Sequence, residues 1–247
     1  MPEIIVRITQ FIVSLPFRLA LAIFINLKIE GLDNVSRLDE SKGIILASNH
    51  HSQIDSIAIA CSLPLFSKHL PIYFVSLDQK EYVRFPIGKY FYGGPLFSLL
   101  GAYSIKYGLR DYSVTLSKHI ELVKQGKTVM IYPEGGIVLG HELGEARGGV
   151  AYLAKETSAP IIPIAIMGEE NMRWWQFLTF QRRVTISFGK PLYFNDIDVK
   201  NVPEEKRYRL AAQNIMQEIK HLIDKQHQKE HVPHPIRIKP RSIKQPA

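Results

Sequence analysis

Two histidines and an aspartate lie within one short polar stretch of the sequence. His50 and His51 are adjacent, and Asp55 follows them in the segment SNHHSQIDS, directly after the apolar run GIILA. An imidazole oriented by a carboxylate is a common form of general base, because the carboxylate fixes the ring tautomer and stabilises the imidazolium. The stretch therefore contains the residue types needed to take a proton from a substrate.

The spacing of His50 and Asp55 restricts the backbone that can bring them together. Side chains on an α-helix diverge by ~100° per residue, so two residues five apart point ~140° from each other on one helix. If a strand ends at Ser48, a turn follows and a helix begins near Gln53, then His50 folds back over the helix start. Its ring can then meet the Asp55 carboxylate.

Two other interpretations fit the same residues. Ser52 and Asp55 form a pattern like a capping box, and an acidic residue in a first helical turn is favoured by the helix dipole. Asp55 can therefore have a purely structural role at the start of the helix. His51 and Asp55, four apart, can also form an ordinary helix pair. Spacing does not choose among these interpretations.

Other catalytic signatures are missing from the sequence. It contains no G-x-S-x-G and no G-x-x-x-x-G-K-[ST] motif, and HELGE (141–145) lacks the second histidine of H-E-x-x-H. The single cysteine, Cys61, lies in the apolar stretch IAIACSL, with no basic neighbour to activate it. We therefore expect a buried thiol, no internal disulfide and a reducing compartment, and we disfavour a serine hydrolase or a thermolysin-like enzyme.

Short apolar runs alternate with helical patterns along most of the chain. Runs rich in β-branched and aromatic residues, bounded by Gly or Pro, predict strands at 43–48, 71–76, 128–133, 160–166 and 183–189. Helical spacing predicts helices at 55–63, 112–125, 148–157 and 204–225. This alternation predicts an α/β fold with a largely parallel central sheet flanked by helices.

Two polar segments follow predicted strands. NHHSQID follows the strand at 43–48, and EGG (134–136) follows the strand at 128–133. Ligands of such sheets bind outside the carboxyl ends of the strands. The two segments are therefore two candidate sites.

The amino-terminal segment 4–27 is apolar and long enough to span a bilayer, at ~20 residues. Four residues interrupt it: Arg7, Gln10, Pro16 and Arg18. No Ala-x-Ala type cleavage site follows it. We predict a membrane-associating helical segment over 1–30, made of one or two short helices bent near the proline, whose arginines reach for lipid headgroups. A helical lid packed on the core is the alternative.

Charge is concentrated at the other end of the chain. The net charge is +8, and residues 225–247 hold six Lys or Arg against one Glu. This polar, proline-rich composition predicts a disordered basic tail, and 31–224 is then the folded domain. No RNA-binding signature or zinc-finger spacing accompanies the tail, so we expect no nucleic-acid partner.

Three segments in order resemble the glycerolipid acyltransferases of the lysophosphatidate acyltransferase type. The family's first signature, His and Asp separated by four residues, is matched by His50 and Asp55 and not by His51. Its third signature, aromatic-Pro-Glu-Gly, is matched by residues 132–135, and its fourth, Val/Ile-Pro-Val/Ile, by residues 162–164. The resemblance covers roughly residues 28–192.

The resemblance implies an enzyme that needs no metal or other cofactor. It implies transfer of a fatty acyl group from acyl-CoA or acyl-carrier protein to the hydroxyl of a lysolipid-like acceptor, with 1-acylglycerol-3-phosphate as the default. His50, held by Asp55, would deprotonate that hydroxyl in a single displacement. The implied substrate-binding residues are Glu134, Gly135, Gly101, Lys106, Arg147 and Pro163.

A lipid substrate predicts that the protein binds to a membrane. Each buried methylene is worth ~0.8 kcal/mol, so a long acyl chain hardly leaves the bilayer for water. The lipid bilayer is therefore an expected partner, and the expected location is peripheral or monotopic on the cytoplasmic face of a membrane. Trp174 and Trp175 are a second candidate contact with the interface, with packing of one of them in the core as the alternative.

The chain departs from the family at two positions. The family's third signature continues with Thr or Ser and then Arg, where this chain has Gly136 and Ile137. Its second signature ends in an acidic residue and Arg, where this chain has Lys106 and Tyr107. Those arginines are associated with the acceptor's phosphate. The acceptor is therefore either a phosphate-bearing lysolipid held by other basic groups, namely Lys106, Arg110 or Arg147, or an uncharged or zwitterionic lysolipid, a glycolipid or an aminolipid.

Two other functions compete with acyl transfer. A metal-dependent hydrolase would use His50, His51 and Asp55 with Glu134 or His141 as ligands, converging at ~2.0 to 2.2 Å on one ion. A noncatalytic membrane-binding homologue would explain the altered second and third signatures, although the retained dyad argues against it.

Overall fold

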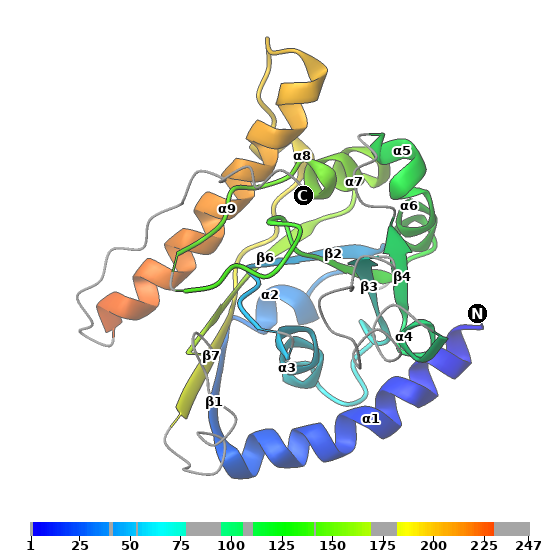
Figure 1. Ribbon diagram of the computed structural model, residues 1–247, viewed down its shortest axis with the longest axis vertical. Helices are drawn as coiled ribbons and strands as arrows, with labels where there is room; N and C mark the ends of the chain where they lie inside the picture. The colour runs from blue at the N-terminus through cyan, green and yellow to red at the C-terminus, as the bar shows by residue number, and fades with distance from the viewer. Residues whose placement is uncertain are drawn as a thin grey trace, which may run out of the picture.

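The structure is a computed structural model, and it describes residues 2–39, 42–52, 54–77, 95–105, 111–140, 142–168 and 182–229. These residues are organised around a seven-stranded sheet (Figure 1). Its strands are β1 (Ile25–Glu30), β2 (Ile44–Ser48), β3 (Ile72–Leu77), β4 (Ala102–Ile105), β5 (Thr128–Ile131), β6 (Ile161–Met167) and β7 (Arg182–Phe188). Their order is β1-β7-β6-β2-β5-β3-β4, and β6 and β7 form the antiparallel pair among these parallel neighbours.

Helices cover both faces of this sheet. They are α1 (Glu3–Phe24), α2 (Asp33–Ser36), α3 (Asp55–Ser62), α4 (Pro95–Leu99), α5 (Tyr112–Thr115), α6 (Ser117–Lys124), α7 (Gly149–Thr157), α8 (Phe194–Ile197) and α9 (Glu204–Lys229). Ile45 and Ala47 face an apolar cluster that includes α6, α7 and α9, whereas Ile44 and Leu46 face a second cluster that includes α3 and the end of α1. Both faces of the central strands are therefore buried, as expected of a parallel sheet.

The predicted α/β fold and all five predicted strands are confirmed. Strands β1 and β4 were not predicted, because β1 follows α1 without a break and β4 is only four residues long. The helix predicted over 112–125 is divided at Leu116 into α5 and α6. These differences leave the predicted layers unchanged.

The predicted segment boundaries are wrong at both ends. Residues 25–30 belong to strand β1 of the sheet and not to the amino-terminal helical segment. At the other end, α9 continues to Lys229, so the first residues of the predicted basic tail are helical. Residues 230–247 lie outside the described residues, as do Trp174 and Trp175.

Helix α1 is one continuous helix that contains Pro16, not two short helices. One side of it binds the core, where Val6 is fully buried. The side chain of Gln10 on the same side donates to the carbonyls of Ile72 (2.6 Å) and Leu100 (2.9 Å) and accepts from the Ile72 amide (3.0 Å). The glutamine that interrupts the apolar segment therefore attaches the helix to the sheet.

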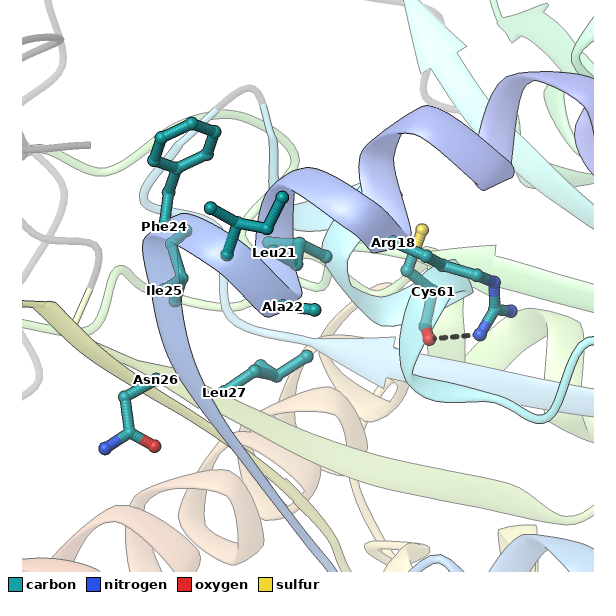
Figure 2. A pocket seen from close by; sticks show the side chains of 9 residues that line it. Arg18, Leu21, Ala22, Phe24, Ile25, Asn26, Leu27 and Cys61 are labelled. Atoms are coloured by element: carbon teal, nitrogen blue, oxygen red, sulfur yellow. Dashed lines mark hydrogen bonds between the residues drawn. The ribbon is translucent and has the colours of Figure 1, made fainter. Parts of the chain in front are cut away.

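Arg18 makes the second polar attachment of α1 (Figure 2). Its guanidinium donates to the carbonyl of Cys61 at 2.8 Å, as Figure 2 shows. It also donates to the carbonyl of Leu63 at 2.7 Å, at the carboxyl end of α3. The prediction that Arg18 reaches for headgroups is wrong, because carbonyls at a helix end attract a cation.

A cavity of about 580 Å³ lies beside this contact, where α1 passes into β1. Cys61 is buried as expected, and burial raises the pKa of its thiol.

The opposite side of α1 is apolar and exposed. Its exposed side chains include Ile4, Ile8, Ile12, Leu15, Leu19 and Ile23. Helix α1 is long and apolar enough to cross a membrane, although the core helix of a soluble protein or a signal sequence can have the same length and composition. Because Gln10 and Arg18 point into the protein, the exposed side carries an apolar stripe along the whole helix.

Replacing Arg18 tests the attachment of α1. Arg18→Ala is expected to lower the free energy of unfolding by about 2 kcal/mol, since hydrogen bonds from a charged donor are lost at partly buried carbonyls. Arg7→Ala is the matched control on the same helix, because Arg7 is half-exposed and pairs with Glu3 at 3.6 Å. Denaturant unfolding in detergent measures both. Equal losses for the two variants would contradict the assignment.

His119 predicts an acid-sensitive fold. It is buried on α6 against Tyr103, and burial lowers the pKa of its imidazole from 6.5 to about 4. The unfolded chain therefore takes up the proton first, and stability present above pH 6.5 is lost as the pH falls toward 4. The loss is about 3 kcal/mol. His119→Leu should remove this part of the pH dependence of unfolding, and His221→Ala, at an exposed position, is the control.

Candidate active site

The two predicted polar segments meet at one edge of the sheet. Strands β2 and β5 are parallel neighbours, with Ala47 paired to Ile131, so the loops after them leave the sheet side by side. The main-chain N–H of His50 donates to Oε2 of Glu134 at 2.8 Å. This contact joins the two candidate sites into one.

The carboxylate of Asp55 is the centre of the first segment. Asp55 is the first residue of α3 and is fully buried. Its Oδ2 accepts three hydrogen bonds, from Nδ1 of His50 (2.9 Å), the N–H of His51 (2.8 Å) and the N–H of Ser52 (3.0 Å). Three N–H groups of the turn between β2 and α3 thus donate to a single oxygen atom.

Asp55 fixes which nitrogen of His50 carries the proton. An ionised carboxylate only accepts hydrogen bonds, so Nδ1 donates and the lone pair lies on Nε2. Among the described residues, no protein group binds Nε2, and 16% of the His50 side chain is exposed. His50 can therefore accept a proton from a bound molecule.

The geometry also decides between the interpretations of this turn. The bonds from Asp55 to two amides stabilise the start of α3, so its structural role exists together with its bond to His50. The ring of His51 does not pair with Asp55, because its Nδ1 donates to the carbonyl of Val138 at 2.9 Å. Helix α3 begins at Asp55, and Gln53 lies outside the described residues.

The ring of Tyr132 stacks on one face of the His50 ring. The two rings are stacked, with centroids 3.8 Å apart and planes 9° apart. The hydroxyl of Tyr132 hydrogen bonds with Oγ of Ser56 on α3 at 2.7 Å. Sequence reasoning noted Tyr132 only as part of a motif and missed Ser56, since a stacking partner from another strand leaves no local pattern.

Asn49 is a second residue that the sequence did not single out. It is fully buried, and its side-chain amide donates to the carbonyl of Ile166 and accepts from the Ile166 N–H, each at 2.9 Å. These bonds continue the pairing of β2 with β6 past the end of β2. Asn49, which precedes His50, thereby attaches the loop after β2 to strand β6.

Glu134 is buried rather than an exposed turn residue, with 7% of it accessible. Besides the His50 amide, it accepts a hydrogen bond at Oε1 from the N–H of Gly144 at 2.6 Å. Burial raises the pKa of the Glu134 carboxyl, although the two amide bonds act in the opposite direction. Both oxygens bind the backbone, and the predicted contact of Glu134 with an acceptor stays a prediction.

The side chains around His50 were also considered as ligands of a metal ion. Among the described residues, no group of three His, Cys, Asp or Glu side chains could hold one. The Nδ1 of His51 and Oδ2 of Asp55 already bind protein groups, and His141, the other proposed ligand, lies outside these residues.

Arg147 lies against the turn that carries Glu134. Its main-chain N–H donates to the carbonyl of Pro133 at 2.7 Å. A Cβ added to Gly135 would lie 2.6 Å from Cδ and Nε of Arg147, so the side chain passes directly over this glycine. Of the predicted substrate-binding residues, Glu134, Gly135 and Arg147 therefore lie together beside His50.

The remaining predicted residues do not join them. Gly101 precedes β4 and contacts Ile72 at the start of β3, so it lies at the amino edge of the parallel strands, opposite His50. Pro163 is buried within β6 and packs against Gly189, so it has no surface for a substrate. The predicted substrate contacts of Gly101 and Pro163 are wrong for these reasons. Lys106 lies outside the described residues.

Comparison with known proteins connects this site to a family. A family model described as acyltransferase matches residues 26–167. Two proteins described as probable 1-acyl-sn-glycerol-3-phosphate acyltransferases, from Mycoplasma genitalium and Mycoplasma pneumoniae, are 25% and 24% identical over 197 and 191 residues. The alignments cover 73% and 72% of this chain, and the chain spans 70% and 65% of those proteins.

A solved structure shares the fold. The crystal structure of a 1-acyl-sn-glycerophosphate acyltransferase from Thermotoga maritima superposes with a TM-score of 0.58 at 18% sequence identity. The match covers 90% of this chain and 79% of that one. At this identity the likeness supports the architecture and not a particular substrate.

Replacing Asp55 tests the role of its carboxylate in the fold. Asp55→Ala removes the acceptor of three donors and is expected to lower the free energy of unfolding by about 3 kcal/mol or more. Asp33→Ala is the control, because Asp33 also lies in a first helical turn but is exposed and forms a surface ion pair with Arg37 at 3.2 Å. The control should lose about 0.5 kcal/mol or less. Similar losses for both variants would mean that the buried contacts of Asp55 contribute little.

Proposed function

Since the chain belongs to the acyltransferase family, we propose that it transfers a fatty acyl group from a thioester donor to the hydroxyl of a lysolipid. One observation carries the proposal. The Nδ1 of His50 donates to a buried carboxylate at 2.9 Å, which leaves Nε2 as a base at an accessible edge of the sheet. The base then needs a substrate hydroxyl to activate.

The reaction is a single displacement. Nε2 of His50 takes the hydroxyl proton while the oxygen attacks the thioester carbonyl and forms the new ester bond. The carbon–sulfur bond breaks, and the imidazolium returns the proton to the leaving thiolate. Asp55 stays ionised throughout and stabilises the imidazolium, and general-base help of this kind contributes ~10²- to 10⁴-fold.

The surrounding residues support that base by holding its position. Tyr132 stacks on the His50 ring, and Glu134 binds the His50 main chain. Backbone N–H groups near the start of α3 or the N–H of Gly136 are candidates to stabilise the oxyanion, whereas the N–H of Gly135 donates to the Tyr132 carbonyl at 2.9 Å. A direct contact of Glu134 with the acceptor remains part of the proposal.

The acceptor proposed by default is 1-acylglycerol-3-phosphate. The relatives from the two Mycoplasma species support it through their descriptions, as does a chloroplastic 1-acyl-sn-glycerol-3-phosphate acyltransferase of Brassica napus, 27% identical over 207 residues. The chain spans 55% of that plant protein. The donor is either acyl-CoA or acyl-carrier protein.

Helix α1 is proposed to bring the site to the lipid. Its inner side binds the core through Gln10 and Arg18, and its outer side is the exposed apolar stripe. A helix with this division lies in the plane of one leaflet with its apolar side in the acyl region. We therefore propose a peripheral or monotopic protein on the cytoplasmic face of a membrane.

Thiol release tests the proposed activity. Detergent-solubilised protein is given long-chain acyl-CoA or acyl-carrier protein with a panel of lysolipid acceptors. Acceptor-dependent thiol release is expected, and His50→Ala should lower it by ~10²- to 10⁴-fold. His51→Asn is the matched control, because asparagine keeps an N–H donor for the Val138 carbonyl and should retain most of the turnover.

The opposite result has a definite meaning. If folded, vesicle-bound wild-type protein released no thiol from either donor with any acceptor, the enzyme proposal would be wrong. A noncatalytic membrane-binding role would then be favoured, in line with the residues Gly136 and Ile137 that replace the family's polar pair.

A further inference from the structure

A polar cavity lies at the amino edge of the parallel strands, at the opposite edge of the sheet from the dyad. Its volume is about 300 Å³, and its polar lining residues are Glu3, Tyr73, Tyr103, Lys118, Gln125 and Lys127. They come from the start of α1, from β3 and β4, and from α6 and the turn before β5. We propose that this cavity binds the phosphodiester headgroup of an anionic phospholipid of the bilayer.

Tyr73 supplies the first evidence for a ligand. Only 2% of this residue is exposed, yet it lines the cavity. Its ring packs against that of Tyr103, with centroids 6.0 Å apart. In the part of the chain that the structure describes, no protein group hydrogen bonds to either hydroxyl. Since the hydroxyl of a buried tyrosine normally has a partner, a bound polar molecule would supply the missing one.

The hydroxyl of Tyr73 is a hydrogen-bond donor at physiological pH. Burial raises the pKa of Tyr73 to about 12, and the nearby Glu3 carboxylate raises it further in the same direction. The hydroxyl therefore keeps its proton. A ligand that offers acceptor oxygens, such as a phosphodiester, matches this donor.

The charges around the cavity favour an anion. Lys127 pairs with Glu3 at 2.6 Å, and Lys118 pairs with Glu121 at 2.8 Å. Arg7 also pairs with Glu3, at 3.6 Å. These three cations therefore face two carboxylates. All three pairs are partly exposed, and exposed ion pairs are weak, so the lysines can bind a phosphate oxygen without a large loss.

Helix α1 connects the cavity to the membrane. Glu3 lines the cavity, and the next residue, Ile4, is exposed and begins the apolar stripe. Consecutive side chains on a helix diverge by ~100°, so the cavity and the stripe lie on adjoining sides of the first turn. When the stripe lies in the acyl region of a leaflet, the cavity lies at the depth of the headgroups. A lipid whose chains contact Ile4 and Ile8 can therefore place its headgroup in the cavity.

The size of the cavity restricts the ligand to a headgroup. Sites that enclose a whole small molecule measure ~300 to 1,000 Å³, and this cavity lies at the lower limit. The acyl chains of the lipid therefore stay outside, along α1. Phosphatidylglycerol has a small anionic headgroup of this kind and is the probe for the test.

This inference goes beyond acyl transfer. It shares with the proposed function only the placement of α1 at a membrane. Vesicles without anionic lipid test that placement separately, and vesicle binding requires no turnover.

Removing one hydroxyl tests the headgroup site without changing any charge. The full chain is mixed with vesicles of phosphatidylcholine, alone or with added phosphatidylglycerol, and the bound fraction is measured by sedimentation. Tyr73→Phe should weaken binding to phosphatidylglycerol vesicles by ~10-fold, as for a hydrogen bond to a charged group, and leave binding to phosphatidylcholine unchanged. Tyr152→Phe, on α7 and outside the cavity lining, is the matched control and should change neither.

Two lysines provide a second matched pair. Lys127 lines the cavity, whereas Lys124 is exposed on α6 and outside the lining. Loss of any one lysine near an anionic surface costs ~5-fold in binding. Lys127→Gln should weaken binding to phosphatidylglycerol vesicles ~10-fold more than Lys124→Gln does. Glu3→Gln breaks the same ion pair as Lys127→Gln but should not weaken binding, so loosening of α1 is distinguished from loss of a headgroup contact.

A soluble headgroup separates a lipid from a free anion as the ligand. Glycerophosphoglycerol carries the same phosphodiester without acyl chains. If calorimetry shows Tyr73-dependent binding of glycerophosphoglycerol or inorganic phosphate, and phosphatidylglycerol vesicles show no dependence on Tyr73, the cavity binds a free anion and the proposal is wrong.

The remaining outcomes separate this inference from the proposed function. If Tyr73→Phe and Lys127→Gln bind phosphatidylglycerol vesicles as well as their controls do, the cavity binds no headgroup, whatever thiol release shows. If the wild-type chain binds neither kind of vesicle, the placement of α1 fails and this inference fails with it. If His50→Ala abolishes transfer and keeps Tyr73-dependent vesicle binding, the headgroup site is separate from the dyad, as the inference requires.

Discussion

The site depends on one oxygen atom, Oδ2 of Asp55. It lies in the protein interior and accepts hydrogen bonds from the His50 ring and from the His51 and Ser52 amides. A buried carboxylate is stable only if donors replace its lost hydration, and the turn supplies them. The same bonds begin α3 and orient the base. The local fold and the chemistry therefore cannot be altered independently.

The sheet turns this local arrangement into a rigid site. Parallel pairing of β2 with β5 places the loops that carry His50 and Glu134 side by side, and Glu134 binds one to the other. Asn49 attaches the first loop to β6, and Tyr132 covers the His50 ring. Each of these contacts joins segments far apart in sequence, so the geometry of the dyad is held by the whole centre of the sheet.

The sequence predicted five of the seven strands of the described sheet and their alternation with helices, because each has a local pattern. The pairing of His50 with Asp55 was one of several interpretations of its spacing, and the family resemblance favoured it. The predictions failed where the deciding partner is distant. Gly101 was placed in the site, but β4 was not predicted, so the edge at which the glycine lies was unknown. Arg18 and Gln10 looked like interruptions of a membrane segment, and only the packed fold shows that they bind main-chain carbonyls. Tyr132 and Asn49 could be identified only from their cross-strand partners.

The tautomer of His50 tests the central claim most directly. Isotope-edited nitrogen NMR of histidine-labelled protein distinguishes a ring protonated on Nδ1 from one protonated on Nε2, and loss of the signal in His50→Gln assigns it. The structure predicts that neutral His50 carries its proton on Nδ1, and that Asp55→Asn weakens this preference. A neutral His50 protonated on Nε2 in the wild-type protein would contradict the account, because that nitrogen could then not accept a proton from a substrate.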